Sequence, residues 1–132
     1  MIVFGRYHKE NIYLSNYFTE SRFIWHDYEF NNVIAAVEST RVPECPAIGF
    51  SSLTPTVAKQ LADSIGHITI DYDSKEYYAL LYEIMYCKFS QDELLKIKLI
   101  NTNNEFLYGD VDIEDYEVGR ILMRIRKQLK ML

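Results

Sequence analysis

The sequence contains only two cysteines, and they show none of the spacings that indicate a built site. Cys45 and Cys87 lie far apart, and neither belongs to a CxxC pair or to a cluster with histidine. The spacing therefore favours neither a disulfide framework nor a zinc site. Two reduced thiols in a cytoplasmic protein are the simpler interpretation.

Long hydrophobic runs and an excess of positive charge are also missing. No apolar stretch approaches the roughly 20 residues that cross a bilayer, and the first residues, MIVFGRYHKE, lack the pattern of a signal peptide. Fourteen lysines and arginines stand against nineteen acids, which gives a net charge of −5. This balance argues against broad binding to nucleic acid or to an anionic membrane. We therefore expect a cytoplasmic protein that has neither a membrane nor a nucleic acid as a partner.

The common catalytic motifs are absent as well. The sequence has no GxSxG, GxGxxG, P-loop or HExxH. No pattern places His8, His26 or His67 beside a nucleophile, so we expect them to be surface or boundary residues. Composition and spacing alone indicate a globular α+β domain and no particular chemistry.

What the chain does have is hydrophobic residues and many tyrosines. A chain of 132 residues with 48% hydrophobic content can bury a core without disulfides or a metal, so we expect one compact domain. Eleven tyrosines would suit a wet cleft in which flat polar ligands stack, although most of them are expected at the core boundary.

Hydrophobic periodicity predicts an α+β fold that is mainly helical with a few short strands. The strands are expected over residues 1–5, 22–25, 67–72 and 105–111. The clearest helix is expected to begin at Thr54, with Pro55 in its first turn and Gly66 at its end.

Further helices are predicted in the second half of the chain. A central helix is expected from Ser74, with a break near Phe89 and Ser90 and more helical turns over residues 91–99. Its expected apolar face consists of Tyr78, Leu81, Tyr82, Met85 and Phe89. A last helix is expected over residues 115–129, with an apolar face made by Val118, Ile121, Leu122, Ile125 and Leu129. Its basic side chains are expected in solvent, and they are Arg120, Arg124, Arg126, Lys127 and Lys130.

The segment YEFNNVIAAVESTR, residues 28–41, predicts a short helix with one unusual acid. Asn31 or Asn32 can cap its start, because a short side-chain acceptor satisfies free backbone N–H groups there. Its expected apolar face consists of Phe30, Val33, Ile34 and Val37. Glu38 is the only charged residue of this helix before Arg41, and it lies one position beyond the apolar face. We therefore expect Glu38 to be half-buried.

Six short motifs follow one another along the chain. They are Phe4-Gly5, LSNY at 14–17, Tyr28 after a strand and a turn, TPTVAKQL at 54–61, KFSQ at 88–91 and VGRILMRIR at 118–126. In order and spacing they resemble the NADAR family, also called YbiA-like, whose members read L-S-N-F, T-P-x-x-A-K-x-L, K-F-S-Q and L-G-x-I-L-M-x-I-R at these places. The resemblance spans nearly the whole chain and implies a single NADAR-like domain over residues 1–132.

The resemblance also implies chemistry on nucleotides. Known members of the family include N-glycosidases that act on phosphorylated riboflavin-pathway intermediates and enzymes that remove ADP-ribose from modified guanine. A pocket for a ribose phosphate or nucleotide would follow, with cleavage of an N-glycosidic bond and no metal or redox cofactor. In such a reaction a carboxylate positions water or stabilises the transition state, and a cation holds the phosphate.

The segment that corresponds to the family's catalytic residues departs from the family pattern. Where members read Y-P-S-x-E-H-x-x-Q-A-x-K, this chain reads YEFNNVIAAVES. The family's Glu, His, Gln and Lys are replaced, in that order, by Asn32, Val33, Ala36 and Ser39. Because asparagine is a poor proton acceptor, family-type acid–base catalysis at Asn32 is expected to be lost. The family's W-G segment is missing too, and Glu117 stands where an asparagine is common.

Three functions remain open from the sequence. We favour a divergent domain that binds a ribose phosphate, ADP-ribose or a related nucleotide, with lost or altered catalysis. The alternative is an active N-glycosidase with a rewired site, in which Glu38 is the catalytic carboxylate and Lys59 or Arg41 the cation. The third is a protein-interaction module on a former enzyme fold, in a small accessory protein of a phage or other mobile element.

The candidate ligand contacts have ordinary structural interpretations beside the functional one. The candidates are Asn16, Tyr17, Tyr28, Arg41 and Lys59. Asn16 fits a turn equally well, and Asn32 fits a helix cap. Lys59 and Asp63 are four residues apart on the predicted helix, so they could simply form an ion pair in solvent.

Overall fold

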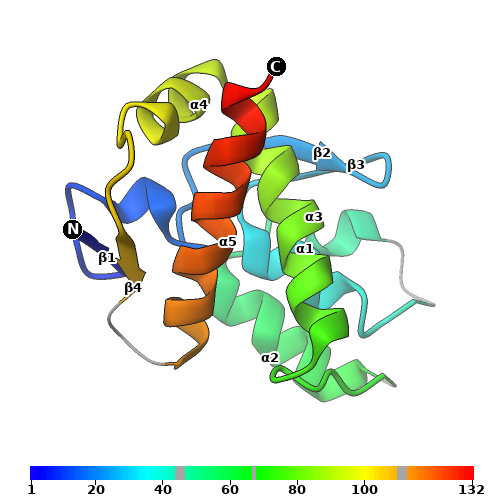
Figure 1. The fold of residues 1–132 in the computed structure, drawn as a ribbon. Coiled ribbons are helices and arrows are strands. Elements are labelled where there is room, and N and C mark those ends of the chain that lie inside the picture. Colours follow the sequence, from blue (N-terminus) through cyan, green and yellow to red (C-terminus); the bar gives the residue numbers. More distant parts are fainter. Residues whose placement is uncertain (44–46, 67, 110–112) are drawn as a thin grey trace.

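Helices form most of the described chain, which comprises residues 1–43, 47–66, 68–109 and 113–132 of this computed structural model. The α-helices are α1 (Val33–Ser39), α2 (Pro55–Ile65), α3 (Lys75–Gln91), α4 (Glu93–Ile100) and α5 (Ile113–Lys130). Helix α3 lies beside α5 on one side and beside α1 on the other, and α2 packs against α1 (Figure 1). This order makes α3 the shared wall of two helical layers.

Two small sheets flank the helices. Strand β1 (Ile2–Phe4) runs parallel to β4 (Leu107–Gly109), and β4 packs against α5. Strands β2 (Phe23–Trp25) and β3 (Tyr28–Phe30) form an antiparallel hairpin that packs against α3 through β2. Single 3-10 turns are present at η1 (Ile12–Leu14) and η2 (Ala47–Phe50). The predicted α+β class, mainly helical with short strands, is confirmed.

The β2–β3 hairpin depends on a tight two-residue turn. His26 and Asp27 adopt φ angles of 49° and 70°, which lie in the left-handed region. Two successive left-handed residues match the twist of hairpin strands. The turn was predicted, but β3 was not, because the sequence assigned its apolar Phe30 to the face of the following helix. In the structure Phe30 lies opposite Phe23 of β2 instead.

The prediction of a strand over residues 67–72 is wrong: residues 68–72, the part that the structure describes, form no strand. Among the described residues this segment pairs with no strand. Its Ile68 N–H donates to the Arg41 carbonyl at 3.2 Å, and Arg41 Nε donates to the Ile68 carbonyl at 3.4 Å. The alternating pattern has no neighbouring strand edge to join, so the segment covers the end of α1 instead.

Capping residues set the helix boundaries. Thr54 accepts a hydrogen bond from the Val57 N–H at 3.3 Å, with Pro55 in the first turn of α2, as predicted. The break between α3 and α4 lies at Asp92 rather than near Phe89. Asp92 has extended backbone angles, and its carboxylate accepts from a backbone N–H of α4. A capping acid therefore ends one helix and begins the next.

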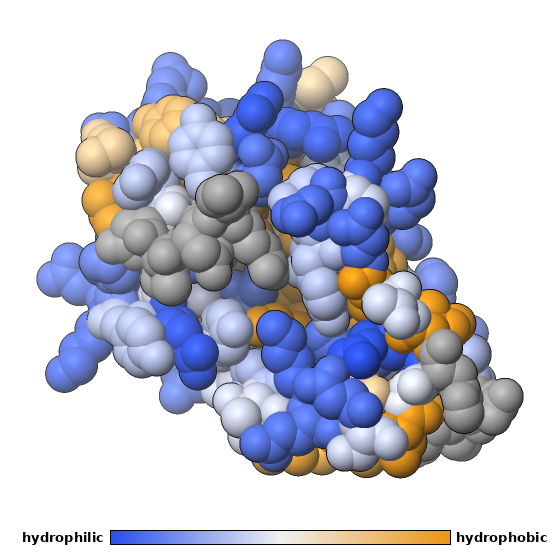
Figure 2. Space-filling view, turned by 90° about the horizontal axis from the view of Figure 1, so that it is seen from below, coloured by the Kyte–Doolittle hydropathy of each residue, from blue (hydrophilic) through white to orange (hydrophobic). Residues whose placement is uncertain are grey.

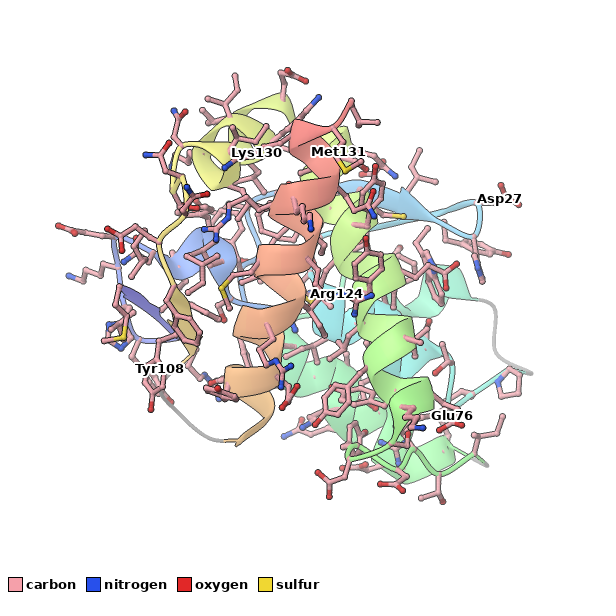
Figure 3. All side chains as sticks on the ribbon, in the orientation of Figure 1. Asp27, Glu76, Tyr108, Arg124, Lys130 and Met131 are labelled. Atoms are coloured by element: carbon pink, nitrogen blue, oxygen red, sulfur yellow. The ribbon has the colours of Figure 1, made fainter. Side chains whose placement is uncertain are left out.

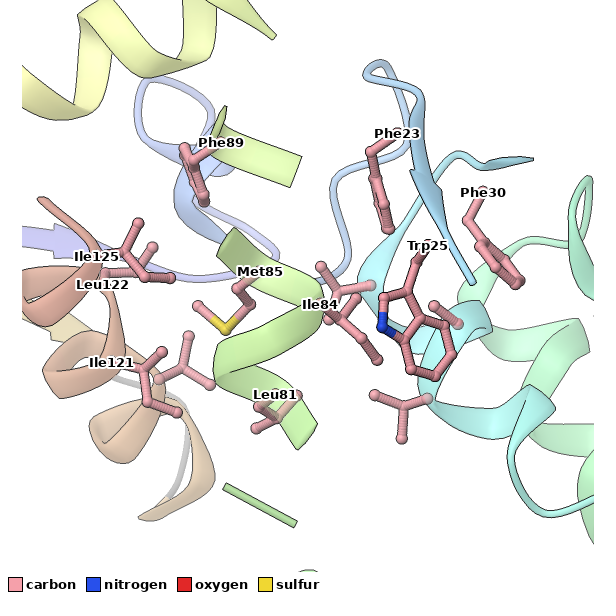
Figure 4. Packing of buried hydrophobic residues seen from close by; sticks show 14 of the residues in the cluster. Phe23, Trp25, Phe30, Leu81, Ile84, Met85, Phe89, Ile121, Leu122 and Ile125 are labelled. Atoms are coloured by element: carbon pink, nitrogen blue, oxygen red, sulfur yellow. The ribbon is translucent and has the colours of Figure 1, made fainter. Parts of the chain in front are cut away.

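Helix α3 buries side chains on two opposite sides. Met85 lies toward α5, and Ile84 lies toward the β2–β3 hairpin (Figure 4). The predicted face of α5 is confirmed as buried: Val118, Ile121, Leu122, Ile125 and Leu129. The predicted face of α3 is partly wrong, because Tyr78 and Tyr82 are only half-buried. A single helical stripe cannot describe a helix that is packed from both sides.

Lys88 of α3 is a fully buried lysine. Its ammonium donates to the Ser15 carbonyl at 2.9 Å and lies 5.4 Å and 4.9 Å from the ring centres of Phe18 and Phe89. Burial lowers the pKa of Lys88 to about 7, although the Asp92 carboxylate opposes that shift. The lysine therefore ties the segment after η1 to α3 and is destabilised in its charged form.

Arg126 of α5 is buried, which contradicts the expectation that it lies in solvent with the other basic residues. Its Nη1 donates to Thr102 Oγ1 and to the Glu105 carbonyl, both at 2.8 Å. The chain between α4 and β4 folds back over this part of α5. The periodicity of α5 alone could not indicate that cover.

The surface of the molecule is mostly polar. Figure 2 shows a face covered largely by hydrophilic side chains, with apolar side chains in small groups between them. Large exposed apolar residues come from several elements, among them Ile24, Val57, Leu94 and Met131. No helix of the described ranges is both long enough and apolar enough to cross a bilayer.

Stability is expected to rise with pH above neutrality because of Lys88. Its folded pKa of about 7 lies below its ordinary value of 10.5, so between these values the unfolded chain binds the extra proton. The free energy of unfolding should therefore increase by up to about 1.4 kcal/mol per pH unit in this window.

Urea unfolding at several pH values between 7 and 9 would measure this slope. The slope should vanish in Lys88→Met and persist in Lys127→Met, which alters an exposed lysine. An unchanged slope in Lys88→Met would refute the assignment.

Candidate functional site

The candidate site is built around Glu38, which lies in the last turn of α1. The side chain is 1% exposed, so it is more deeply buried than the sequence suggested. Its Oε2 accepts a hydrogen bond from Arg41 Nη1 at 2.9 Å, and its Oε1 accepts one from the Tyr72 hydroxyl at 2.9 Å. Each carboxylate oxygen therefore has one partner.

Arg41 connects Glu38 to α2. Its Nη1 also donates to Asp63 Oδ1 at 2.7 Å. Burial alone would lower the pKa of Arg41, but the hydrogen bonds to Asp63 and Glu38 outweigh it and raise that pKa further. The result is a permanent positive charge held between one buried and one exposed carboxylate.

Tyr72 closes the site from the loop before α3. Burial and the hydrogen bond to Glu38 raise the pKa of Tyr72 to about 12, so its hydroxyl stays protonated as a donor. Its ring meets that of Tyr77 edge-on at 4.9 Å between centres, and Lys59 Nζ lies 5.6 Å from its centre. Tyr72 therefore joins the loop, α2 and α3 over Glu38.

A narrow cleft lies beside this network. Its lining residues are Tyr17, Ile34, Val37, Glu38, Lys59, Tyr72, Tyr77 and Leu81. About 270 Å³ lies between the walls, but only about 10 Å³ can hold the centre of a water molecule. A site of this size holds about one water. The cleft is therefore closed to larger ligands in this conformation.

The structure brings four of the sequence-predicted residues together. Tyr17, Glu38 and Lys59 line the cleft. Arg41 is not part of the lining but donates a hydrogen bond to Glu38. The Lys59–Asp63 ion pair, which was the alternative interpretation of Lys59, is not formed: Asp63 bonds to Arg41, and Lys59 lies over the ring of Tyr72.

Tyr28 and Asn16 lie outside the lining of the cleft. Tyr28 is exposed on β3, where it lies opposite Trp25 of β2. Asn16 is buried next to Tyr17 in sequence, and its Oδ1 has no hydrogen-bond partner.

Asn32 lies at the opposite end of α1 from Glu38 and acts as its cap. Its Oδ1 accepts from the Ala35 N–H at 2.7 Å. Its Nδ2 donates to the Leu53 carbonyl at 2.9 Å and to Asn31 Oδ1 at 2.7 Å. The cap was one of the alternatives from the sequence. The amide oxygen forms the cap, and the amide nitrogen joins the start of α1 to the Leu53 carbonyl.

Sequence reasoning missed Tyr72, Tyr77 and Asp63 as parts of the site. Tyr72 was assigned to a strand and Asp63 to a different ion pair. Tyr72 is far from Glu38 in the chain, and no local pattern indicates that their side chains meet. The excess of tyrosine was the only signal, since a wet aromatic cleft was one expected use of it.

This architecture is similar to that of a solved structure. An NMR structure of the E. coli protein YbiA matches with a TM-score of 0.78, over 98% of this chain and 86% of that one. This chain has a YbiA-like fold. The two sequences are 14% identical, so the likeness concerns the fold alone. A scan against protein-family models and a search of curated proteins give no match.

Within the YbiA-like fold, the motifs that resemble the NADAR family make scaffold contacts. KFSQ supplies Lys88, which bonds to the Ser15 carbonyl of LSNY. TPTVAKQL supplies the cap of α2. VGRILMRIR supplies the buried Arg126 and also Gly119, where a Cβ would lie 2.3 Å from the Leu107 carbonyl oxygen. The motifs therefore specify how the elements pack.

Arg41→Met should destabilise the fold strongly, because it leaves the buried Glu38 carboxylate with Tyr72 as its one hydrogen-bond donor. We expect a loss of about 3 kcal/mol in the free energy of unfolding. Asp63→Asn should cost less than about 1 kcal/mol, because Asp63 is 69% exposed.

Adding Glu38→Gln to Arg41→Met should recover part of the loss, as measured by a double-mutant cycle in urea. Equal losses for Arg41→Met and Asp63→Asn would contradict this account of the network.

Asn32→Ala should destabilise the fold by about 2 kcal/mol, because α1 loses its cap and the Leu53 carbonyl loses its donor. The neighbouring Asn31→Ala is the matched control and should have a much smaller effect. Thermal unfolding of both variants would measure the difference. An effect of Asn32→Ala as small as that of Asn31→Ala would rule out the capping role.

Proposed function

We propose that this chain is a non-catalytic NADAR-type domain that binds a ribose phosphate, ADP-ribose or a related nucleotide at the mouth of the Glu38 cleft. The observation that supports loss of catalysis is the state of the Glu38 carboxylate. Both of its oxygens accept hydrogen bonds, from Arg41 and from Tyr72. A general base needs an oxygen within reach of the proton that it removes. Here the two oxygens serve to hold the walls together.

The rim of the cleft favours a ligand with a flat ring and a phosphate. A cationic side chain lies over the ring of each of two tyrosines in the lining. The guanidinium carbon of Arg6 lies 4.1 Å from the ring centre of Tyr17, and Lys59 Nζ lies 5.6 Å from that of Tyr72. Aromatic faces accept flat rings, and lysine and arginine accept phosphate oxygens. Together they suit a nucleotide better than an apolar ligand.

Entry of such a ligand requires Tyr72 to move. The closed cleft has room for about one water. Sites that bind small molecules commonly have volumes of roughly 300 Å³ or more. Tyr72 lies on a segment without helix or strand, and its neighbours Asp71 and Asp73 are exposed. The loop is therefore the part of the wall that can shift with the least loss of packing.

A rewired N-glycosidase is the second candidate. The observation in its favour is that a carboxylate borders a space of about one water, which is the arrangement needed to position a nucleophilic water. In this case Glu38 would exchange its bond to Tyr72 for one to water, and Arg41 would stabilise negative charge.

Titration with ADP-ribose, NAD and ribose 5-phosphate tests the proposal. We expect saturable binding, a raised Tm and no release of free base by chromatography. Lys59→Gln should weaken binding about tenfold through loss of a phosphate contact. Lys127→Gln, which changes an exposed lysine of α5, should leave binding unchanged.

Other outcomes would decide for the alternatives. Release of base that disappears in Glu38→Gln would establish the enzyme. If no nucleotide raises the Tm at saturating concentrations, both nucleotide functions fail and the protein-interaction module is left.

A further inference from the structure

Helix α3 borders a second hollow on the side away from Glu38. Tyr77 and Leu81 line the Glu38 cleft, whereas the second hollow is lined by Lys75, Tyr78, Ala79, Tyr82 and, from α5, Arg124. Positions 75, 78, 79 and 82 share one helix face because they are three or four residues apart. The two hollows are thus separated by the body of the helix.

The second hollow is large enough for a small ligand as it stands. Its volume is about 360 Å³, compared with about 10 Å³ at Glu38. Ligand sites of roughly 300–1,000 Å³ are usual, and they are mostly apolar with a few polar groups. Ala79, which has a short side chain, lines the hollow together with Tyr78 and Tyr82. No movement of the chain is needed to admit one aromatic ring.

Two cations border this hollow. Arg124 reaches from α5 toward α3, and its guanidinium carbon lies 4.7 Å from the ring centre of Tyr82 (Figure 3). Lys75 is exposed in the first turn of α3. Among the described residues, neither Lys75 nor Arg124 forms an ion pair within 4.0 Å, and no acid lines the hollow. This positive charge stands out on a chain of net charge −5.

We propose that the hollow between α3 and α5 binds a small aromatic anion, a single ring that carries a phosphate or carboxylate. The ring packs on Tyr78, Ala79 and Tyr82, and the anionic group lies at Arg124 and Lys75. The planar guanidinium is oriented by its contact with Tyr82 and donates two parallel hydrogen bonds to such a group. Five described residues of α3 and α5 line the hollow, and the ligand that we propose for it is a free small molecule.

This proposal is independent of the function proposed for the Glu38 cleft. The two sites share no lining residue, and Arg124 and Tyr82, the residues varied below, are absent from the lining of the Glu38 cleft. A ligand made of one phenyl ring and one phosphate is also much smaller than a nucleotide. Binding here therefore neither requires nor implies binding at Glu38.

Phenyl phosphate is a suitable probe, with phenol and inorganic phosphate as its two halves. Two-dimensional ¹H–¹⁵N spectra during titration should show saturable shifts of the Ala79 and Tyr82 amides with phenyl phosphate. Each half alone should bind more weakly, by about tenfold or more, because it lacks either the charge or the ring contact. The Tyr72 amide should remain unshifted.

Variants then separate the roles of charge and ring. Arg124→Gln and Tyr82→Leu should each weaken phenyl phosphate binding about three- to tenfold. Arg120→Gln is the matched control, because Arg120 is an exposed arginine on the same helix that does not line the hollow. Its Nη1 lies 3.9 Å from Glu117 Oε1. All three positions are at the surface or half-buried, and an unchanged Tm would show that each variant is folded.

Two results would overturn the proposal. One is the absence of shifts at Ala79 and Tyr82 at millimolar phenyl phosphate. The other is equal binding of phenol and phenyl phosphate that Arg124→Gln does not alter, since this would indicate an apolar hollow with no preference for anions.

Discussion

A carboxylate at the end of a buried helix is the constraint on which the region around α1 depends. Six of the seven residues of α1 are buried, so Glu38 cannot be solvated by bulk water. A buried charge is tolerated only with partners, and these come from the chain after α1 and from the loop before α3. The need to satisfy one acid thus joins α1, α2 and the Tyr72 loop and closes the cleft above them.

Helix α3 separates two surfaces of opposite character. Toward α1 it contributes Tyr77 and Leu81 to a closed cleft around a buried acid. Toward α5 it contributes Tyr78 and Tyr82 to an open hollow bordered by cations. The alternation of tyrosines along this helix supplies aromatic walls to both sides. In this YbiA-like fold the same helix therefore borders both the closed cleft and the open hollow.

Local patterns predicted those features that depend on neighbours in sequence. The start of α2 at Thr54 and Pro55 and the five-residue apolar face of α5 were predicted correctly, because capping and helical periodicity act within a few residues. The motif order also predicted the fold, since motifs such as KFSQ and LSNY supply the contacts between elements. The prediction that Arg126 lies in solvent was wrong, because a segment from elsewhere in the chain covers this side chain.

The sequence by itself determined the α+β class, most helix boundaries and the presence of Asn32 where the motif pattern that it resembles has a glutamate. It also marked Glu38 as an unusual acid. Only the tertiary structure decided that Asn32 is a cap, that Glu38 is paired with Arg41 and Tyr72, and that the cleft is closed. Caps and helical faces depend on spacing along the chain, whereas the pairing of Glu38 with Tyr72 depends on residues that only folding brings together.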